Sequence, residues 1–410
     1  MTGNHGGRTV NHDTASGHWM ETLDKKIFGT LFFSLFATVT GVGIVVPLLP
    51  VYAHDLGASG IYIGLIFGAF SISRTCFLPY FGRRSDREGR KPFITIGLLA
   101  YAILSVAFAI SQTVEALIAI RFIQGIASAM TMPVIQAYVG DITPADREGV
   151  VMGTFNMSVF FGLSLGPIIG GAVSDRISMD GAFLCMGALA FIGFLLSLVF
   201  LPPVRSERST QRYRFDGWMP LLRNERIIGL FLFRFAYTAC IGIIWGFQPV
   251  FADAEMGLST SAIGVLVALG VLTAGVLQTP MGYLADRVSR RGMAISGGVI
   301  VTYAVASFSW AVGFWDLFVA NILFGVGGGV AMAPVMAMAV RAGSRTGAMG
   351  SVLSLLTVGH SLGMMCGALL AGVTMELVAL RPAFAFGSVI MVAGMATFHV
   401  LTRPREACDF

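Results

Sequence analysis

Charged residues are scarce in this sequence. Of its 410 residues only 12% are Asp, Glu, Lys or Arg, whereas 55% are hydrophobic. An average soluble domain has about 25% charged residues. A soluble protein of this composition would expose large apolar patches to water and aggregate. The scarcity of charge therefore excludes an ordinary soluble protein and predicts an integral membrane protein that has the lipid bilayer as its solvent.

The sequence also lacks the motifs of several other classes of protein. Its five cysteines are scattered, with no C-x-x-C pair and no disulfide framework. It contains no P-loop, no H-E-x-x-H metal motif, no nucleophile elbow and no dinucleotide fingerprint. We therefore expect no metal site, no cofactor and no enzymatic activity. The net charge of +5 does not indicate a nucleic-acid partner, because the basic residues lie in short segments between apolar runs.

Long apolar runs dominate what is present. A membrane helix needs roughly 20 apolar residues to cross the hydrocarbon core. The first run is too long for the apolar part of a cleaved signal peptide, so we expect it to remain as a membrane helix. The predicted spans are residues 27–52, 60–81, 93–111, 116–138, 149–173, 182–201, 227–251, 261–281, 293–313, 317–339, 347–373 and 383–401.

The distribution of basic residues predicts the orientation of these spans, because cytoplasmic loops of membrane proteins are enriched in Lys and Arg. With the N-terminus in the cytoplasm, 22 of the 27 basic residues lie in cytoplasmic segments, and only Arg176 and Arg381 lie on the opposite side. The remaining three, Arg74, Arg121 and Arg234, lie inside spans. We therefore expect both termini in the cytoplasm and a location in a bacterial inner membrane or one derived from it.

The longest polar segment divides the spans six and six. An internal repeat supports this division, since the segment 82–91 recurs as 282–291, with Ser289 in place of the second glycine. We expect a disordered tail at 1–26, a six-helix half at 27–201, a linker at 202–226, a second half at 227–402 and a tail at 403–410. Substrates of transporters built from such repeats bind between the halves, near the midplane of the membrane.

The segment between the second and third spans is the first candidate site. Gly82 is expected to let the chain turn sharply, and Asp86 to accept hydrogen bonds from arginines or a helix N-terminus. Such a clasp would hold one side of the protein shut, whereas the alternative is an ordinary basic loop. Its candidate residues are Gly82, Asp86, Arg87, Gly89, Arg90 and Lys91.

Polar residues within or near the spans form the second group of candidates. Arg121 and Gln124 are three residues apart and share a helix face. A buried arginine in a membrane helix is costly and needs a partner, unless it snorkels to the interface. The candidates for proton coupling or for lining a cavity are Arg121, Gln124, Asp55, Glu115, Arg74, Arg234 and His360.

A glycine string in the fifth span is the third candidate. Glycines at intervals of four permit close contact between membrane helices, and Pro167 removes a backbone hydrogen bond. The string contains Gly162, Gly166, Pro167, Gly170 and Gly171.

These three motifs resemble those of the major facilitator superfamily, in particular its twelve-span drug:H+ antiporter branch. The resemblance extends over residues 27–402 and implies an all-α fold of twelve transmembrane helices in two pseudo-symmetric halves. It implies a role in proton transfer for Arg121, and the glycine string is similar to the motif that marks the antiporters of the family. We therefore expect a monomer that exports small amphipathic compounds or drugs in exchange for protons by alternating access.

One absence departs from the family pattern. The stretch 27–52 contains no Asp or Glu, and no carboxylate lies near the middle of any span. Proton coupling would then run through Asp55, Glu115, Asp86, Asp141 or His360, or be absent. A cavity with three arginines and no acid would also suit an anionic substrate. The alternatives are a transporter of a metal ion, siderophore, nutrient anion or lipid, and a non-transporting membrane assembly factor.

Overall fold

The computed structural model describes residues 25–143, 148–203, 221–346 and 348–403. Nearly all of the predicted N-terminal tail, most of the predicted linker and most of the predicted C-terminal tail lie outside these ranges. Within them the chain is helical and contains no strand. The long helices are α2 (Lys25–Asp55), α3 (Gly60–Glu88), α4 (Arg90–Ile110), α5 (Val114–Ile142), α6 (Glu148–Arg176), α7 (Met179–Phe200), α8 (Glu225–Ala254), α9 (Thr260–Ala285), α10 (Arg290–Ser307), α11 (Phe314–Thr346), α12 (Met349–Leu377) and α13 (Leu380–Leu401).

In the described part of the chain, twelve helices are long and apolar enough to cross a membrane, which confirms the predicted number of spans. Two short 3-10 helices, η2 (Leu221–Arg223) and η3 (Phe308–Trp310), flank α8 and α10. In lipid, helices satisfy their own backbone hydrogen bonds, which is why apolar runs of this length fold in this way.

The turn between α3 and α4 lies at a different residue from the one predicted. Gly82 lies inside α3, which continues to Glu88, and a Cβ atom added to Gly82 would meet no atom within 4 Å. The expectation of a sharp turn at Gly82 is therefore wrong, and no neighbouring helix among the described residues requires a glycine there. The turn lies at Gly89, whose φ of 97° is a conformation that favours glycine.

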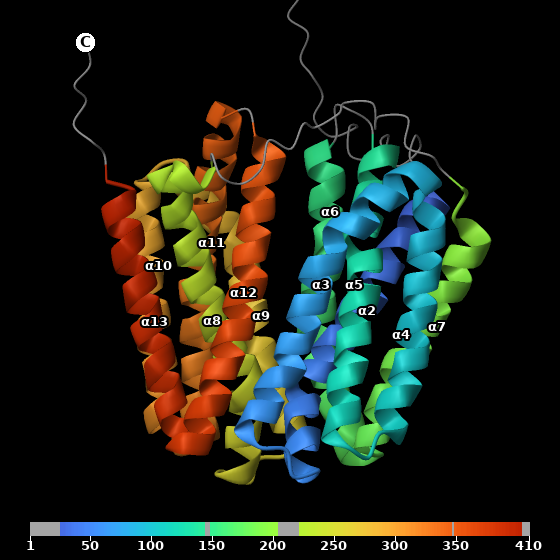
Figure 1. Cartoon of the computed structure of the whole chain (residues 1–410), viewed down its shortest axis with the longest axis horizontal. Coiled ribbons are helices and arrows are strands. Elements are labelled where there is room, and N and C mark those ends of the chain that lie inside the picture. Colours follow the sequence, from blue (N-terminus) through green and yellow to red (C-terminus); the bar gives the residue numbers. More distant parts are fainter. Residues whose placement is uncertain (1–24, 144–147, 204–220, 347, 404–410) are drawn as a thin grey trace, which may run out of the picture.

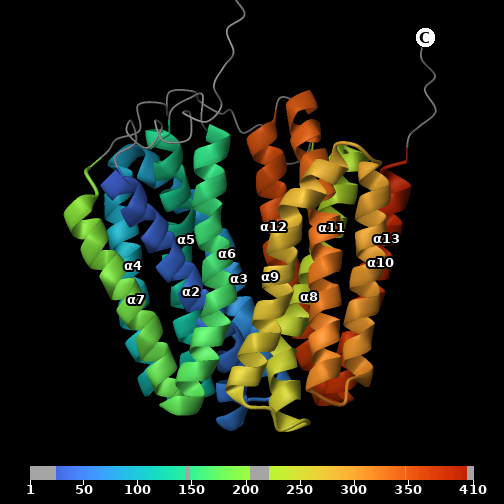
Figure 2. The same ribbon diagram turned by 180° about the vertical axis from the view of Figure 1, so that it is seen from behind.

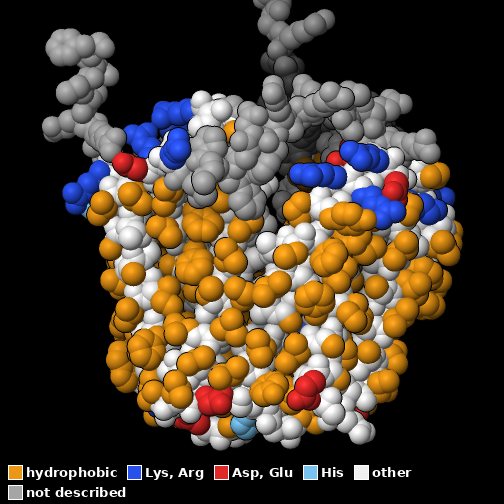
Figure 3. Space-filling model, in the orientation of Figure 1, with side chains coloured by type: hydrophobic (Ala, Val, Ile, Leu, Met, Phe, Trp, Pro, Cys, Tyr) orange, Lys and Arg blue, Asp and Glu red, His pale blue; other side chains and the backbone are white. Residues whose placement is uncertain are grey.

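The helices form two bundles of six, α2–α7 and α8–α13, as Figures 1 and 2 show from opposite sides. The bundles meet near the end opposite the C-terminus and diverge toward the end that bears it. This arrangement confirms the all-α fold with two six-helix halves. In Figure 3 hydrophobic side chains cover the middle of the molecule, with Lys and Arg gathered at one end. We call this end, where α3 and α13 finish, the basic end, and the opposite one the acidic end.

Small residues allow the two halves to touch. A Cβ atom on Gly60 of α3 would lie 2.3 Å from the carbonyl oxygen of Gly372 in α12, and one on Gly264 of α9 would lie 2.2 Å from that of Pro167 in α6. Any larger side chain at these glycines would push the helices apart. The most extensive contacts between the halves are therefore made by α3 with α12 and by α6 with α9, and α2 also contacts α8.

Candidate functional site

Two adjoining cavities lie between the halves. One, of about 240 Å³, is lined by α2, α3, α5 and α6 of the first half and by α8 and α12 of the second. The other, of about 260 Å³, lies mainly within the second half. Both are lined by Leu163, Trp245 and His360, so we treat them together as the central cavity. Its position between the two repeats is where transporters of this architecture bind substrate.

Arg121 is held in the wall of the central cavity. It is only 4% exposed, and one Nη donates a hydrogen bond of 2.7 Å to Oε1 of Gln124. Its guanidinium lies 4.3 Å from the ring centroid of Phe70 and 5.4 Å from that of Phe67. Aromatic faces stabilise a cation at such distances. Arg121 is therefore fixed against α3 and does not snorkel to the membrane surface.

Arg74 also lines the central cavity, from α3. Its Nε atom is buried and finds no hydrogen-bond partner in the described part of the chain. Leaving a buried donor of a charged group unpaired is costly. Arg74 therefore retains an unused donor beside the space in which a solute would lie.

Arg234 and His360 meet across the second half. An Nη of Arg234 lies 3.3 Å from Nδ1 of His360, and the other approaches Sδ of Met332 at 3.0 Å. Guanidinium groups only donate, so Nδ1 of His360 must be the acceptor and the proton of a neutral ring lies on Nε2. Both side chains line the central cavity, so this pair places a further positive charge in its wall.

The described residues that line the central cavity include three arginines and no Asp or Glu. Three of the predicted candidates do not contribute to it. Asp55 is exposed at the end of α2 and Glu115 is exposed in the first turn of α5, whereas Gln124 is fully buried and accepts the hydrogen bond from Arg121. Positive charge in a low-dielectric wall is costly unless an anion compensates it. The cavity is thus suited to a solute that carries negative charge and apolar surface.

Two carboxylates that the sequence analysis missed join the halves at the acidic end. Asp175, at the end of α6, accepts hydrogen bonds from the backbone N–H groups of Thr260 (3.1 Å) and Ser261 (2.8 Å), and from the Thr260 hydroxyl. Glu376, near the end of α12, accepts a bond of 3.4 Å from the backbone N–H of Ile61. Each carboxylate thus caps the first turn of a helix in the other half, where the helix dipole favours negative charge. We call them the acidic-end caps.

The internal repeat could have revealed the acidic-end caps. Each lies at the end of the fifth span of its half, and each capped helix is the second span of the other half. Neither carboxylate belongs to a recognised motif, although Asp175 follows the glycine string by four residues. Only the pairing of equivalent positions would have indicated both.

At the basic end, Arg90 is the centre of a cluster in the first half. It is 6% exposed and forms ion pairs with Asp86 (2.5 Å) and Asp141 (3.1 Å), and it donates to the Ser85 hydroxyl at 2.9 Å. We call Asp86, Arg90 and Asp141 the Arg90 clasp. It ties the α3–α4 turn to the end of α5, so these bonds lie within one half, not between the halves.

The other two charged residues of the first motif lie beside the clasp. Lys91 donates a hydrogen bond of 2.8 Å to the Leu198 carbonyl in α7, and Arg87 is exposed in the last turn of α3. Lys91 therefore holds α4 to α7, whereas Arg87 faces the surroundings of the protein.

The glycine string forms two contact faces of α6. Cβ atoms on Gly162, Gly166 and Gly170 would lie within about 3.1 Å of atoms in α2, at Thr40 and Ile44 among others. On the other face, a Cβ atom on Gly171 would lie 2.4 Å from the Thr260 carbonyl oxygen of α9. Pro167 contributes to both faces, since its ring lies close to Gly43 of α2 and its carbonyl oxygen close to Gly264 of α9. The string therefore lies where α6 contacts both its own half and the other.

Comparisons with known proteins agree with this architecture. A family model described as Major Facilitator Superfamily matches residues 31–251 and 230–407. The chain is 26% identical over 390 residues to the uncharacterized MFS-type transporter MJ1560 of Methanocaldococcus jannaschii, covering 94% of this chain and 100% of that protein. It is 34% identical over 179 residues to the quinolone resistance protein NorA of Staphylococcus aureus, covering 44% of this chain and 46% of NorA. The crystal structure of the nucleoside transporter NupG superimposes with a TM-score of 0.80 at 16% identity, over 92% of this chain and 100% of that one.

Proposed function

This chain belongs to the major facilitator superfamily of membrane transporters, and we propose that it exports amphipathic organic anions from the cytoplasm by alternating access, coupled to protons. The observation that carries the proposal is the central cavity, which combines Arg74, Arg121 and Arg234 with aromatic walls and no described acidic residue. An anion would compensate charge that the protein leaves unbalanced, and its apolar part would contact Phe67, Phe70 and Trp245.

We assign the basic end to the cytoplasm, in accordance with the positive-inside rule. The protein would then be an integral protein of a bacterial inner membrane with both termini in the cytoplasm. Because the two halves touch through α3–α12 and α6–α9 glycines and diverge toward the basic end, the conformation is that of a transporter ready to take up solute from the cytoplasm.

Export and proton coupling are supported by similarity. The α6 glycine string is similar to the antiporter motif of the family, and NorA, which is similar to this chain over less than half its length, is described as a quinolone resistance protein. Since the described cavity lining includes no Asp or Glu, we place proton binding at His360 or at carboxylates outside the cavity. We propose that the transporter acts as a monomer.

The test uses inside-out membrane vesicles with an acidic interior and two fluorescent amphipathic dyes of similar size. One dye is an aromatic sulfonate and the other an aromatic quaternary ammonium compound. We expect the sulfonate to accumulate only when a pH gradient is present. Arg74→Gln and Arg121→Gln should each reduce its accumulation, whereas Arg223→Gln, an exposed arginine outside the cavity, should not.

Each component of the proposal has its own contrary result. Accumulation of the ammonium dye alone would refute the assignment of an anionic substrate. Sulfonate accumulation without dependence on the pH gradient would refute proton coupling. Trp245 lines the cavity, so a bound dye should quench its fluorescence. If neither dye accumulates or quenches this fluorescence, the protein does not export amphipathic compounds, and a small specific solute becomes the better candidate.

A further inference from the structure

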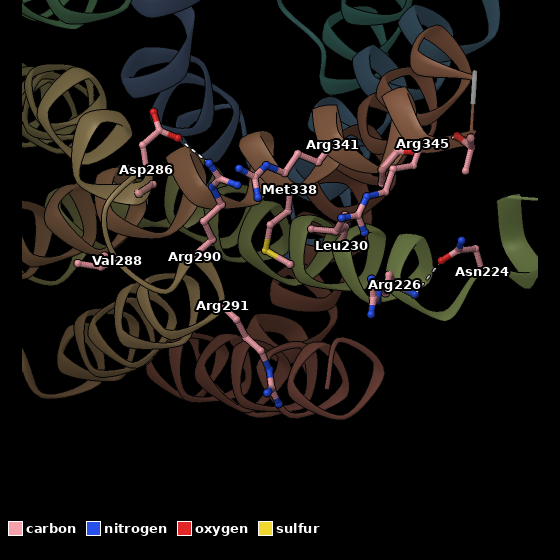
Figure 4. A pocket seen from close by; sticks show the side chains of 13 residues that line it. Asn224, Arg226, Leu230, Asp286, Val288, Arg290, Arg291, Met338, Arg341 and Arg345 are labelled. Atoms are coloured by element: carbon pink, nitrogen blue, oxygen red, sulfur yellow. Dashed lines mark hydrogen bonds and ion pairs between the residues drawn. The ribbon is translucent and has the colours of Figure 1, made fainter. Parts of the chain in front are cut away.

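A second cavity lies at the basic end of the second half. Its volume is about 420 Å³, and none of its lining residues belongs to the central cavity. It is formed by the start of α8, the turn between α9 and α10, and the end of α11 (Figure 4). We call it the basic pocket, because the described residues that line it include five arginines and a single carboxylate, Asp286. The arginines are Arg226, Arg290, Arg291, Arg341 and Arg345.

Asp286 neutralises only one of these arginines. It forms an ion pair of 2.5 Å with Arg290, and its own side chain is 69% exposed. In Figure 4 the side chains of Arg290 and Arg341 point toward one another beside Asp286. Two guanidinium groups that approach in this way repel each other unless an anion lies between them or close to both. The pocket therefore has a surplus of positive charge.

Donors for an anion are present as well as charge. The Nε atoms of Arg290 and Arg291 are buried and have no hydrogen-bond partner in the described part of the chain. One Nη of Arg291 donates to the His399 carbonyl at 2.6 Å, so that side chain is fixed while its Nε remains unused. Buried donors of charged groups are almost always satisfied in proteins, by a partner, a water or an ion. In Figure 4 the Arg291 side chain extends away from Arg290 and Arg341. The unused Nε of Arg290, beside Asp286, is therefore the donor that a ligand between Arg290 and Arg341 could satisfy.

The walls of the basic pocket are partly apolar. Leu230, Met338 and Ala342 line it together with the arginines. A volume of about 420 Å³ exceeds what a single inorganic ion needs, and lies in the range of about 300–1,000 Å³ typical of sites for organic ligands. The ligand is therefore expected to carry an organic part beside its anionic group.

We propose that the basic pocket binds the phosphate group of an organic phosphate. Arginine forks match phosphate oxygens in bidentate fashion, and several arginines together are typical of phosphate recognition. Two sources share this chemistry, the head group of an anionic phospholipid in the adjacent leaflet and a soluble phosphorylated compound of the cytoplasm. Basic pockets between helix ends at this depth bind anionic lipid head groups in other membrane proteins. Occupancy would hold α10, α11 and α8 together by removing the repulsion among their arginines. This proposal does not rest on the cargo of the central cavity.

The test measures binding to the full-length protein, purified in a neutral detergent and depleted of lipid. One arm uses short-chain phosphatidylglycerol below its micelle concentration. Its reference is short-chain phosphatidylcholine, a zwitterion in which the choline group neutralises the phosphate. The other arm uses inorganic pyrophosphate. Bound ligand is counted by native mass spectrometry, and Kd is obtained from the shift of thermal unfolding. The variant is Arg341→Gln/Arg345→Gln, and the matched control is Arg83→Gln/Arg223→Gln, which removes two exposed charges from the same end of the molecule.

We expect one of the phosphate probes to bind wild type, and the pocket variant to weaken its Kd by at least about tenfold while the control leaves it unchanged. Binding of phosphatidylglycerol alone would identify a lipid ligand, and binding of pyrophosphate would identify a soluble one. Equal binding of phosphatidylcholine and phosphatidylglycerol without pyrophosphate binding, or equal weakening by both double variants, would overturn the proposal. If the double variant does not fold, Arg341→Gln alone and Arg345→Gln alone give the same readout with a smaller shift.

Discussion

In the first half Arg90 forms ion pairs with two carboxylates, Asp86 and Asp141, whereas in the second half the equivalent Arg290 is paired with Asp286 alone. The end of α11, which corresponds to the end of α5, has no acidic residue in 335–346 and carries Arg341 and Arg345. The same loop pattern has thus become a neutralised cluster in one half and a surplus of positive charge in the other. Both halves therefore have a turn at this place in the sequence repeat, but the charges around the two turns are balanced differently.

The two turns also differ in their backbone. Gly89 adopts a φ of 97°, where glycine is favoured, while Ser289 has a φ of −61° and its side chain accepts a hydrogen bond from the N–H of Gly292. The serine that weakens the second copy of the motif is therefore an N-cap of α10. The replacement of the second motif glycine by Ser289 therefore changes how the start of the helix is capped, from a glycine turn to a side-chain N-cap.

Other equivalent positions have stayed alike. Asp175 and Glu376 both cap a helix of the other half, and Lys91 and Arg291 both donate to a carbonyl of the last helix in their half. The central cavity shows the opposite trend, since the position equivalent to Arg121, 200 residues on, is Asn321. The repeat is preserved where helices are held to one another, between or within the halves, and has diverged in the central cavity.

The largest effect is expected at Arg121 and its equivalent Asn321. Arg121→Gln removes a buried cation from the cavity wall and should lower kcat/KM for the sulfonate dye about 30-fold or more, since such truncations cost roughly 2–5 kcal/mol. Asn321→Ala should change it less than about twofold, because the Asn321 side chain donates to the Leu317 carbonyl of its own helix. Equal losses would show that the cavity is functionally symmetric, contrary to this comparison.

The next effect concerns how much Arg90 of the Arg90 clasp and Arg290 of the basic pocket contribute to the stability of the protein. Arg90→Ala leaves two carboxylates without their shared partner and should reduce the free energy of unfolding by about 3–5 kcal/mol. Arg290→Ala breaks one pair with a largely exposed carboxylate and should cost about 1 kcal/mol or less. Denaturant unfolding in detergent, without added phosphate, measures both. A cost at Arg290 as large as that at Arg90 would contradict the difference in charge balance.

A smaller effect is expected for the acidic-end caps. Asp175→Ala removes three hydrogen bonds to α9 and should shift the population toward separation of the halves at the acidic end by about tenfold. Glu376→Ala removes one long bond and should shift it about twofold. Spin labels at Ile177→Cys and Val378→Cys, two exposed positions on different halves, report the separation in a background with the native cysteines replaced. A larger shift from Glu376→Ala than from Asp175→Ala would reverse this ranking.

The smallest effects are expected for Lys91 and Arg291, which occupy equivalent positions and make the same kind of hydrogen bond in the two halves. Lys91→Ala and Arg291→Ala each remove one half-buried side chain that donates to a carbonyl, at Leu198 and His399. Both should lower Tm by about 2 °C or less, by similar amounts, in protein free of phosphate. Added phosphate ligand should then separate them, because only Arg291 lines the basic pocket. Identical behaviour with phosphate would contradict the assignment of that pocket.

Much of the fold followed from local properties of the sequence. The number of spans was predicted correctly because a run of about 20 apolar residues can satisfy its backbone in lipid only as a helix. The helix ends were less accurate, since α3 continues to Glu88 and α11 to Thr346, beyond the apolar runs that predicted them. Polar residues at the ends of membrane helices extend past the hydrocarbon core, so hydropathy does not mark where the helix stops.

The candidate site was predicted only in part. Arg74, Arg121 and Arg234 stood out because a charged residue inside an apolar run is costly and must have a partner or a role. Asp55 and Glu115 were selected by sequence proximity to spans, yet both are exposed at the acidic end and neither lines the cavity. The sequence indicates how far along its helix a residue lies. It does not indicate whether the side chain faces a neighbouring helix or the surroundings of the protein.

The sequence by itself determined that this protein is a bundle of twelve membrane helices in two related halves, because hydropathy and internal repetition are properties of consecutive residues. Only the tertiary structure decided which polar groups come together: Arg234 with His360, Asp175 with the start of α9, and Arg341 with Arg290 as lining residues of the basic pocket. The members of each pair lie some fifty or more residues apart and on different helices or turns. Their meeting depends on how far each helix is rotated and how closely it packs, which the glycine contacts between helices set.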